Sequence, residues 1–218
     1  MTTTTLDMRV THARRRSGRL LGPLGGLGLV AGLIGLIASP AGEDTGETPA
    51  EVVAYAASHE GWTVAILLFA LGSIALSAAF VAGIHERLRD VLTPTEGALV
   101  LVGGTVFALC FAMCWIVWGA PLADMPDDGV RALAQAEAYL GYDDIGWFLL
   151  AAAGVGAAIV AIPASLAAMR AGLPRWLGWL GVAAGIGSLG TVAFLGMFAW
   201  MAWIAVASVV LLVASSER

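Results

Sequence analysis

Long runs of uncharged, apolar residues recur along this chain, and they limit its fold more than any other feature does. An α-helix rises about 1.5 Å per residue, so about 20 apolar residues are needed to cross a hydrocarbon layer roughly 30 Å thick. Such runs occupy residues 20–39, 62–84, 97–118 and 145–169. With 59% of residues apolar and 12% charged, the composition indicates a helical membrane protein.

The last apolar stretch, residues 177–213, is too long for one membrane span, because a single helix of that length would reach about 55 Å. The glycine-rich segment GIGSLGT, residues 185–191, is its weakest helical part and predicts a turn. We therefore expect a fifth span at about 174–190 and a sixth at about 193–214. The expected fold class is all-α, a polytopic transmembrane helix bundle of six spans in three hairpins.

The distribution of basic residues predicts the orientation of this bundle. All eleven basic residues are arginines, and with six spans ten of them fall on the side of the two termini. Short cytoplasmic loops retain arginine, so we expect a plasma-membrane protein with a cytoplasmic basic tail at 1–19, a membrane domain at 20–214 and a cytoplasmic end at 215–218. Only Arg131 falls on the opposite, non-cytoplasmic side of the membrane. A nucleic-acid partner is not indicated, because the short arginine cluster lies beside a membrane span.

A cleaved signal peptide is the alternative interpretation of the first span. Arginines, an apolar run and the small-residue sequence ASPAG together resemble one. However, the run has full membrane-span length, and its removal would leave five spans with an outward C-terminus. We therefore expect the first span to be retained.

Two segments on the opposite, acidic side predict short helices outside the membrane. In the first, Thr48 is a suitable N-cap and Glu51 lies three residues later, which is the pattern of a capping box. The second follows Asp127 or Asp128 as its cap and is expected to end at Gly141. Each short helix is expected to lead into a membrane span.

Polar residues close both of these outer helices and form the first candidate site. His59 ends the first helix, and Asp143 with Asp144 follows the second, so the three side chains are outer-rim candidates. A histidine with two carboxylates can bind a divalent cation, respond to pH near neutrality or act in acid–base catalysis. Solvated helix ends explain the same residues without a site, and we favour that interpretation.

The sixth predicted span contains the sequence MFAWMAW, which supplies the second candidate site. Met197, Trp200 and Trp203 are candidates for lining a pocket for a lipid, a quinone or another apolar ligand. Packing of methionine and aromatic side chains within the bundle is the favoured alternative.

Apart from Arg175 at the start of the fifth, none of the six predicted spans contains Asp, Glu, Lys, Arg or His. Ion-coupled carriers and proton relays commonly place ionisable side chains within the membrane, so their usual machinery is missing. Cys110 and Cys114 lie on one helical face, but two thiols alone are an incomplete metal site. No histidine in a span is available to hold a haem. We expect no catalytic residue, cofactor or metal.

Glycine and tryptophan spacings suggest how the spans pack. Gly28 with Gly32, and Gly181 with Gly185, have the spacing that lets two membrane helices approach closely, and we favour packing within one chain over a dimer face. Most tryptophans are expected in interface belts, namely Trp62, Trp115, Trp118 and Trp147 outside and Trp176 and Trp179 inside.

Four phrases carry a resemblance to a known family: PAEVVAYAASHEG, AGIHERLRD, YDDIGWFL and AGLPRWLGWLG. From about Thr48 to Val213 the chain resembles a broad group of actinobacterial multi-span proteins, assigned to domain-of-unknown-function family four-three-eight-six. The lysine-free, alanine-rich composition is in keeping with a GC-rich actinobacterial source. The resemblance implies a six-span membrane bundle and gives no activity, cofactor or catalytic residue.

These observations favour a non-enzymatic integral membrane protein in an accessory or interaction role. Its expected partners are the lipid bilayer and another membrane protein. One alternative is a small carrier or channel for a neutral or apolar solute. A second is a membrane-embedded enzyme with its site at the outer rim.

Overall fold

The computed structural model describes the backbone of residues 3–39, 44–126, 129–190 and 195–216, and this part of the chain is all-helical. Its helices are α1 (Thr3–Ile37), α2 (Pro49–Ser58), α3 (Glu60–Leu88), α4 (Pro94–Ala123), α5 (Gly129–Arg170), α6 (Arg175–Ser188) and α7 (Leu195–Ser216). Five segments are long and apolar enough to cross a membrane, namely α3, α4, α5, Leu20–Ile37 of α1 and Gly196–Val213 of α7. The architecture is consistent with a helical membrane bundle, as the apolar runs predict.

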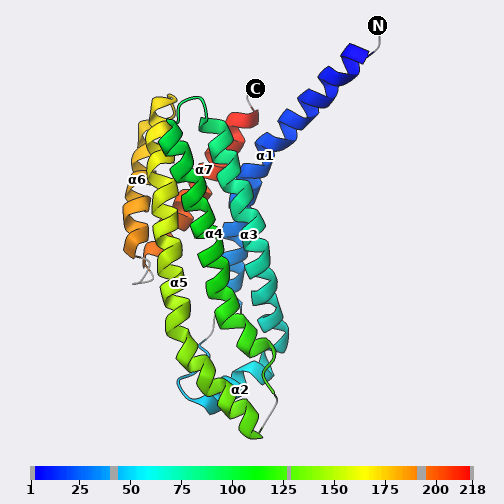
Figure 1. Ribbon diagram of the computed structural model, residues 1–218, viewed down its shortest axis with the longest axis vertical. Helices are drawn as coiled ribbons and strands as arrows, with labels where there is room; N and C mark the ends of the chain where they lie inside the picture. The colour runs from blue at the N-terminus through cyan, green and yellow to red at the C-terminus, as the bar shows by residue number, and fades with distance from the viewer. Residues whose placement is uncertain (1–2, 40–43, 127–128, 191–194, 217–218) are drawn as a thin grey trace.

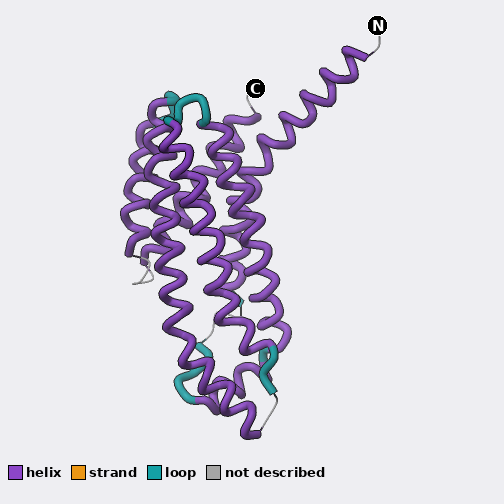
Figure 2. Tube along the Cα trace, in the orientation of Figure 1, coloured by secondary structure: helices purple, strands orange, loops and turns teal. Residues whose placement is uncertain are grey.

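The long helices form a closed ring in which each helix packs against its neighbours in the sequence. Contacts join α1 to α3, α3 to α4, α4 to α5, α5 to α6 and α6 to α7, and α7 returns to α1. The start of α1 and the end of α7 lie at the same end of the bundle, and α2 lies across the other end (Figures 1 and 2). The helix α2 packs mainly on α5 and therefore covers that end of the ring.

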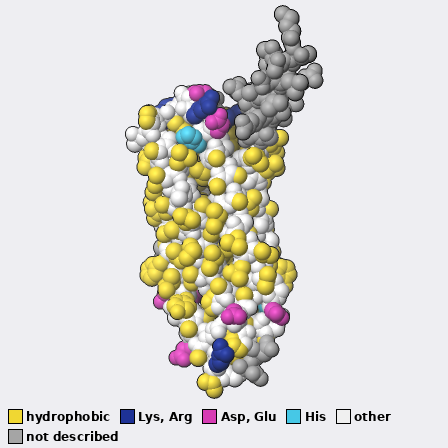
Figure 3. All heavy atoms as spheres, turned by 45° about the vertical axis from the view of Figure 1, so that its right-hand side comes forward, with side chains coloured by type: hydrophobic (Ala, Val, Ile, Leu, Met, Phe, Trp, Pro, Cys, Tyr) yellow, Lys and Arg dark blue, Asp and Glu magenta, His cyan; other side chains and the backbone are white. Residues whose placement is uncertain are grey.

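Charged side chains gather at the two ends of the bundle, and the band between them is apolar on the face that Figure 3 shows. Large apolar side chains in this band are exposed, for example Leu68, Leu71 and Val102. Among the residues whose side chains the structure describes, which begin at residue 20, no Asp, Glu, Arg or His side chain is buried. A broad exposed apolar surface without buried charge is the pattern of a protein surrounded by lipid.

Glycines bring the helices into close contact within the chain, as their spacing predicts. A Cβ atom on Gly32 would lie 2.8 Å from the ring of Phe69 in α3, and one on Gly28 would lie 3.1 Å from Leu76. In α6, a Cβ on Gly181 would collide with the hydroxyl of Ser165, and one on Gly185 with Ile162, both in α5. These glycine pairs therefore serve packing within one bundle.

The second predicted outer helix does not exist as a separate element. Helix α5 runs without interruption from Gly129 to Arg170, about 63 Å, and the predicted stop at Gly141 is wrong. A glycine that ends a helix usually takes a positive φ, whereas the only glycines with a positive φ in the described residues are Gly46, Gly129 and Gly172. The predicted caps, Asp127 and Asp128, lie outside the described residues.

The capping box of α2 is confirmed, and α5 ends as a glycine cap requires. The Oγ1 of Thr48 accepts from the backbone N–H of Glu51, and the Glu51 carboxylate accepts from the backbone N–H of Thr48. At the other end of the bundle, Gly172 has a φ of 79°, and the N–H of Leu173 donates to the carbonyl of Ala168 at 3.1 Å. This hydrogen bond closes α5 in a Schellman motif.

Helix α6 is the element that departs most from the predicted span length. It has 14 residues, about 21 Å, which is less than a hydrocarbon layer of roughly 30 Å. The described residues therefore contain five candidate spans where the sequence predicts six. Helix α6 ends, and α7 begins, part of the way along the bundle, so neither helix reaches the end that α2 covers (Figure 1). Helices α3, α4 and α5 extend further toward that end (Figure 1).

Candidate functional site: the acidic-end cavity

We call the end covered by α2 the acidic end and the opposite end, which carries Arg87, Arg89, Arg170 and Arg175, the basic end. A cavity of about 500 Å³ lies at the acidic end, and we call it the acidic-end cavity. Its described lining comes from α1, α2, α3, α4, α5, the start of α7 and the loop before α2. Its apolar lining comprises Leu36, Ile37, Ile66, Leu122, Leu140, Leu150 and Met197.

The position of this cavity follows from the short α6–α7 hairpin. Met197 lies in the first turn of α7 and lines the cavity together with Leu36, near the end of α1. Helix α7 begins part of the way along the bundle (Figure 1), and its first turn contributes Met197 to the cavity lining. The cavity is thus bounded by the bundle core on one side and by α2 on the other.

Aromatic rings form much of the wall, and they belong to Tyr55, Trp115, Trp118, Tyr139 and Trp147. The rings of Trp115 and Trp118 lie 5.4 Å apart at 81°, and those of Trp118 and Trp147 lie 5.4 Å apart at 69°. Edge-to-face pairs of this kind are a favourable aromatic arrangement. They fix successive rings in nearly perpendicular planes beside the cavity.

A glycine on α5 lets the tryptophan wall pack this closely. A Cβ atom on Gly146 would lie 2.2 Å from the indole Nε1 of Trp118, so no other residue fits there without moving the ring. Within the described part of the chain, the buried indole N–H groups of Trp115 and Trp118 have no hydrogen-bond partner. The Trp147 indole donates to Oδ2 of Asp143 at 3.2 Å.

Carboxylates line the outer part of the cavity, and they belong to Asp44, Glu47 and Asp143. No Arg or His is among the described lining residues. The Asp44 carboxylate accepts the backbone N–H of Gly46 at 3.0 Å, while Asp143 holds Trp147. In the described structure, none of these three carboxylates forms a salt bridge. The rim of the cavity is therefore negatively charged.

The loop of residues 44–47 covers part of the cavity and is held by several contacts. The Glu51 carboxylate accepts from the backbone N–H groups of Glu47 and Thr48, both at 3.0 Å. The hydrogen bond with the Thr48 side chain, followed by these two backbone hydrogen bonds, favours the ionised form and lowers the pKa of Glu51 from its ordinary value. The hydroxyls of Thr45 and Tyr139 lie 3.5 Å apart and link the loop to α5.

The structure separates the three outer-rim candidates. Asp143 is half-buried and lines the acidic-end cavity, whereas the exposed Asp144 does not. His59 caps the end of α2, where its ring stacks on Tyr55 at 4.5 Å and its Nδ1 lies 2.9 Å from the Ser58 hydroxyl. Among the described residues, no group of three His, Cys, Asp or Glu side chains could hold a metal ion.

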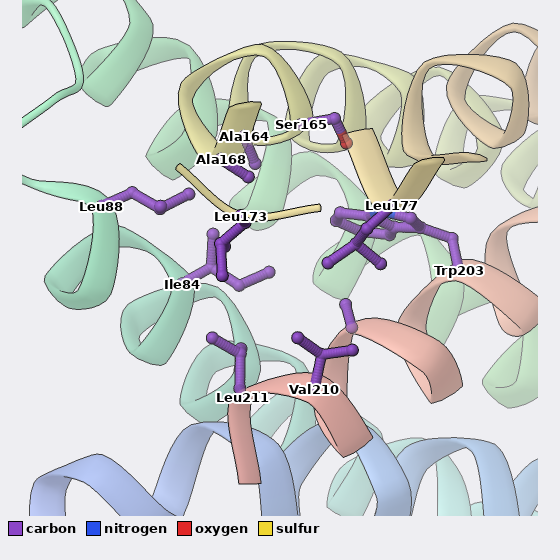
Figure 4. A pocket seen from close by; sticks show the side chains of 11 residues that line it. Ile84, Leu88, Ala164, Ser165, Ala168, Leu173, Leu177, Trp203, Val210 and Leu211 are labelled. Atoms are coloured by element: carbon purple, nitrogen blue, oxygen red, sulfur yellow. The ribbon is translucent and has the colours of Figure 1, made fainter. Parts of the chain in front are cut away.

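The three apolar-ligand candidates also lie in different places. Met197 lines the acidic-end cavity, and Trp200 is fully buried, with its ring 4.9 Å from that of Phe107 and 5.4 Å from that of Phe111. Trp203 lines a second, smaller cavity of about 40 Å³ near the basic end (Figure 4). Trp200 therefore belongs to the aromatic core and lines neither cavity.

Several tryptophans of the cavity wall are also expected in interface belts. Trp115, Trp118 and Trp147 are only half-exposed and line the cavity, while Trp62 and Trp179 are exposed as a belt requires. A position in an interface belt is compatible with lining the cavity, so the belt assignment of these three tryptophans stays a prediction.

The spacing of residues along α5 indicates which of its side chains lie together at the cavity. Tyr139, Asp143 and Trp147 follow one another at intervals of four, so they lie on one face of a continuous helix. An uninterrupted α5 would have placed the phenol, the carboxylate and the indole together. With a helix end at Gly141, Tyr139 and Asp143 would not belong to one helix, so the predicted stop conceals this common face.

The chain was compared with known protein families, curated proteins and solved structures, and none of them matches it.

Proposed function

We propose that the chain is a non-enzymatic multi-pass membrane protein that binds an apolar or amphiphilic molecule from the bilayer in the acidic-end cavity. The observation that carries this proposal is a cavity of about 500 Å³ with apolar and aromatic walls. Ligand pockets in proteins commonly have volumes of roughly 300–1,000 Å³ and are lined mainly by such side chains, with a few polar groups.

The polar groups of the described lining support binding more than catalysis. They are the carboxylates, the Thr45 hydroxyl, the Gly46 backbone and the phenols of Tyr55 and Tyr139. Covalent catalysis needs a nucleophile within hydrogen-bond reach of a base that activates it. The Thr45 hydroxyl has a phenol as its neighbour at 3.5 Å, so this contact supplies no such base.

We also propose that the protein lies in the plasma membrane with its basic end toward the cytoplasm, and that α6 makes a short sixth crossing. The arginines at the basic end support this orientation. The common position of the start of α1 and the end of α7 supports an even number of crossings (Figure 1). Membership of the domain-of-unknown-function group stays a prediction and adds no activity.

Tryptophan quenching tests the proposed binding, because three tryptophans line the cavity. The purified protein in uncharged maltoside micelles is titrated with dodecanol brominated near its hydroxyl, and emission is recorded. Wild type is compared with Leu140→Trp, which enlarges a lining side chain, and with Leu109→Trp, which adds the same ring on the exposed outer surface.

We expect saturable quenching in wild type and Leu109→Trp, and an apparent affinity at least about fivefold weaker in Leu140→Trp. Quenching that rises without saturation, equally in all three proteins, would mean that the alcohol only partitions into the micelle. That result would refute binding in the cavity.

A further inference from the structure

The acidic-end cavity combines a charged rim with an apolar interior, and this combination restricts the molecule that fits it. Asp143 lies on the same face of α5 as Leu150, two helical turns further along, and both line the cavity. Met197 lines it from the first turn of α7. An occupant therefore meets carboxylates at the outer part and apolar side chains in the deeper part.

All charged side chains among the described residues of the rim are acidic. The cavity is lined by Asp44, Glu47 and Asp143, and no cationic side chain is among its described lining residues. An anionic head group would meet carboxylates without a compensating charge. A phosphate-bearing lipid head would meet the same repulsion, even when it also carries an ammonium group.

The aromatic wall adds a second, independent preference for a cation. The face of an indole or phenol ring carries partial negative charge and attracts ammonium groups, and quaternary ammonium ligands are bound by cages of such rings. Here Trp118 makes near-perpendicular pairs with Trp115 and Trp147, so the three rings differ in orientation around one space. Tyr55 and Tyr139 line the same cavity from α2 and α5.

One contact joins the carboxylates to the rings. Asp143 accepts the indole N–H of Trp147 through Oδ2, which fixes the ring and leaves the second carboxylate oxygen without a hydrogen bond in the described structure. Because Gly146 in the adjoining turn has no Cβ atom, the Trp118 ring packs closely against α5. The rim thus offers a half-buried negative charge beside aromatic rings that are fixed in place.

We infer that the acidic-end cavity selects cationic amphiphiles. The ammonium head of a single-chain alkylamine or alkyl quaternary ammonium compound lies between Asp143 and the tryptophan rings, and its chain extends toward Met197. This inference rests on the proposed function, because it specifies the head group of the molecule that the cavity binds.

The test compares three 12-carbon amphiphiles that are brominated at the same chain position and differ only in the head group. They carry a trimethylammonium, a hydroxyl or a carboxylate group, and each is titrated into the protein in maltoside micelles while tryptophan quenching is recorded. The proteins are wild type, Asp143→Asn and Asp144→Asn. Asparagine at 143 keeps an oxygen that accepts the Trp147 N–H, and Asp144 is an exposed neighbour outside the cavity lining.

Wild type and Asp144→Asn are expected to bind the trimethylammonium compound about tenfold more tightly than the alcohol, and to bind the carboxylate most weakly. Asp143→Asn is expected to lose most of the preference for the cation without changing its affinity for the alcohol.

The other outcomes overturn the inference in distinguishable ways. Equal saturable binding of the three compounds would refute selection by charge and leave the proposed function intact. If Asp143→Asn and Asp144→Asn lose the preference for the cation equally, general surface charge and not the cavity produces that preference, and the inference is refuted. If no compound shows saturable binding, both the inference and the proposed function fail.

Discussion

Gly46 shows at the scale of one residue how the cover of the cavity depends on backbone geometry. Its φ of 93° lies in the left-handed region, and a Cβ atom there would lie 2.4 Å from Cβ of Glu51. Any side chain at this position would strain the loop and press on the residue whose carboxylate holds it. The arrangement of Asp44 and Glu47 at the rim therefore requires glycine here.

We predict that Gly46→Ala loosens this loop, because a left-handed conformation costs an alanine roughly 1–2 kcal/mol. Hydrogen exchange of the backbone amides at 46–48 should become several-fold faster, measured by mass spectrometry on the purified protein. Gly61→Ala is the matched control, since a Cβ atom there meets nothing within 4 Å. Unchanged exchange in Gly46→Ala would show that the loop is not held as described.

At the scale of the helix, α4 and α5 pack closely at Gly156. A Cβ atom on Gly156 would lie 2.5 Å from the backbone N of Phe107, and a backbone atom cannot move aside as a side-chain end can. We predict that Gly156→Ala destabilises the bundle by about 1–3 kcal/mol, the usual range for overpacking, and lowers the thermal midpoint.

Gly141→Ala on the same helix provides the opposite prediction. Gly141 lies within the continuous α5, and a Cβ there meets nothing within 4 Å. Alanine should therefore stabilise the helix by about 0.5–1 kcal/mol. A clear loss of stability in Gly141→Ala would contradict a continuous α5, because it would indicate a backbone that only glycine adopts.

The N-terminus of α2 depends on the ionised form of Glu51. The hydrogen bonds from Thr48 and Glu47 lower the pKa of Glu51 in the folded protein. A lowered folded-state pKa means that the stabilisation is present above the unfolded-state value and is lost as pH falls through the folded value. We predict that the amide resonance of Thr48, followed by NMR, shifts with a midpoint below the ordinary glutamate pKa. In Glu51→Gln this titration should disappear; a midpoint at or above the ordinary value would contradict the capping geometry.

The elements that the sequence predicts well are those with local signals. The Thr48–Glu51 capping box lies at the start of α2, and the uncharged runs lie within α3 and α4. Each signal is therefore part of the helix that it predicts. Gly141 predicts a helix stop that α5 does not have. The buried face that continues through Tyr139 and Gly146 outweighs the weak helical preference of a single glycine.

The candidate site was only partly predictable, for a physical reason. Asp143 has a local signal in the sequence, because it lies with Asp144 directly before a long apolar run. Tyr55 of α2 and Asp44 of the loop before α2 line the same cavity as Asp143, because α2 packs across α5, and Met197 of α7 lines it as well. Both facts depend on contacts between segments far apart in the sequence, and neither has a local signal.

At the scale of the whole molecule, orientation is a separate prediction. Ten arginines fall on the side of the termini when α6 is counted as a crossing, which favours a cytoplasmic basic end. A reporter that is active only in the cytoplasm, fused after Arg218, should therefore be active in cells. A reporter fused at the same place that requires export should be inactive. The reverse pattern would contradict six crossings with a cytoplasmic start.

The central claim is that the acidic-end cavity holds an amphiphile within the bundle. Photolabelling tests it most directly, using a 12-carbon trimethylammonium compound with a diazirine at mid-chain and mapping the adducts by mass spectrometry. We expect saturable labelling of α5 near Leu150 and α7 near Met197, reduced in Leu140→Trp and unchanged in Leu109→Trp. Labelling confined to exposed outer residues such as Leu68 and Leu71, without saturation, would contradict the claim.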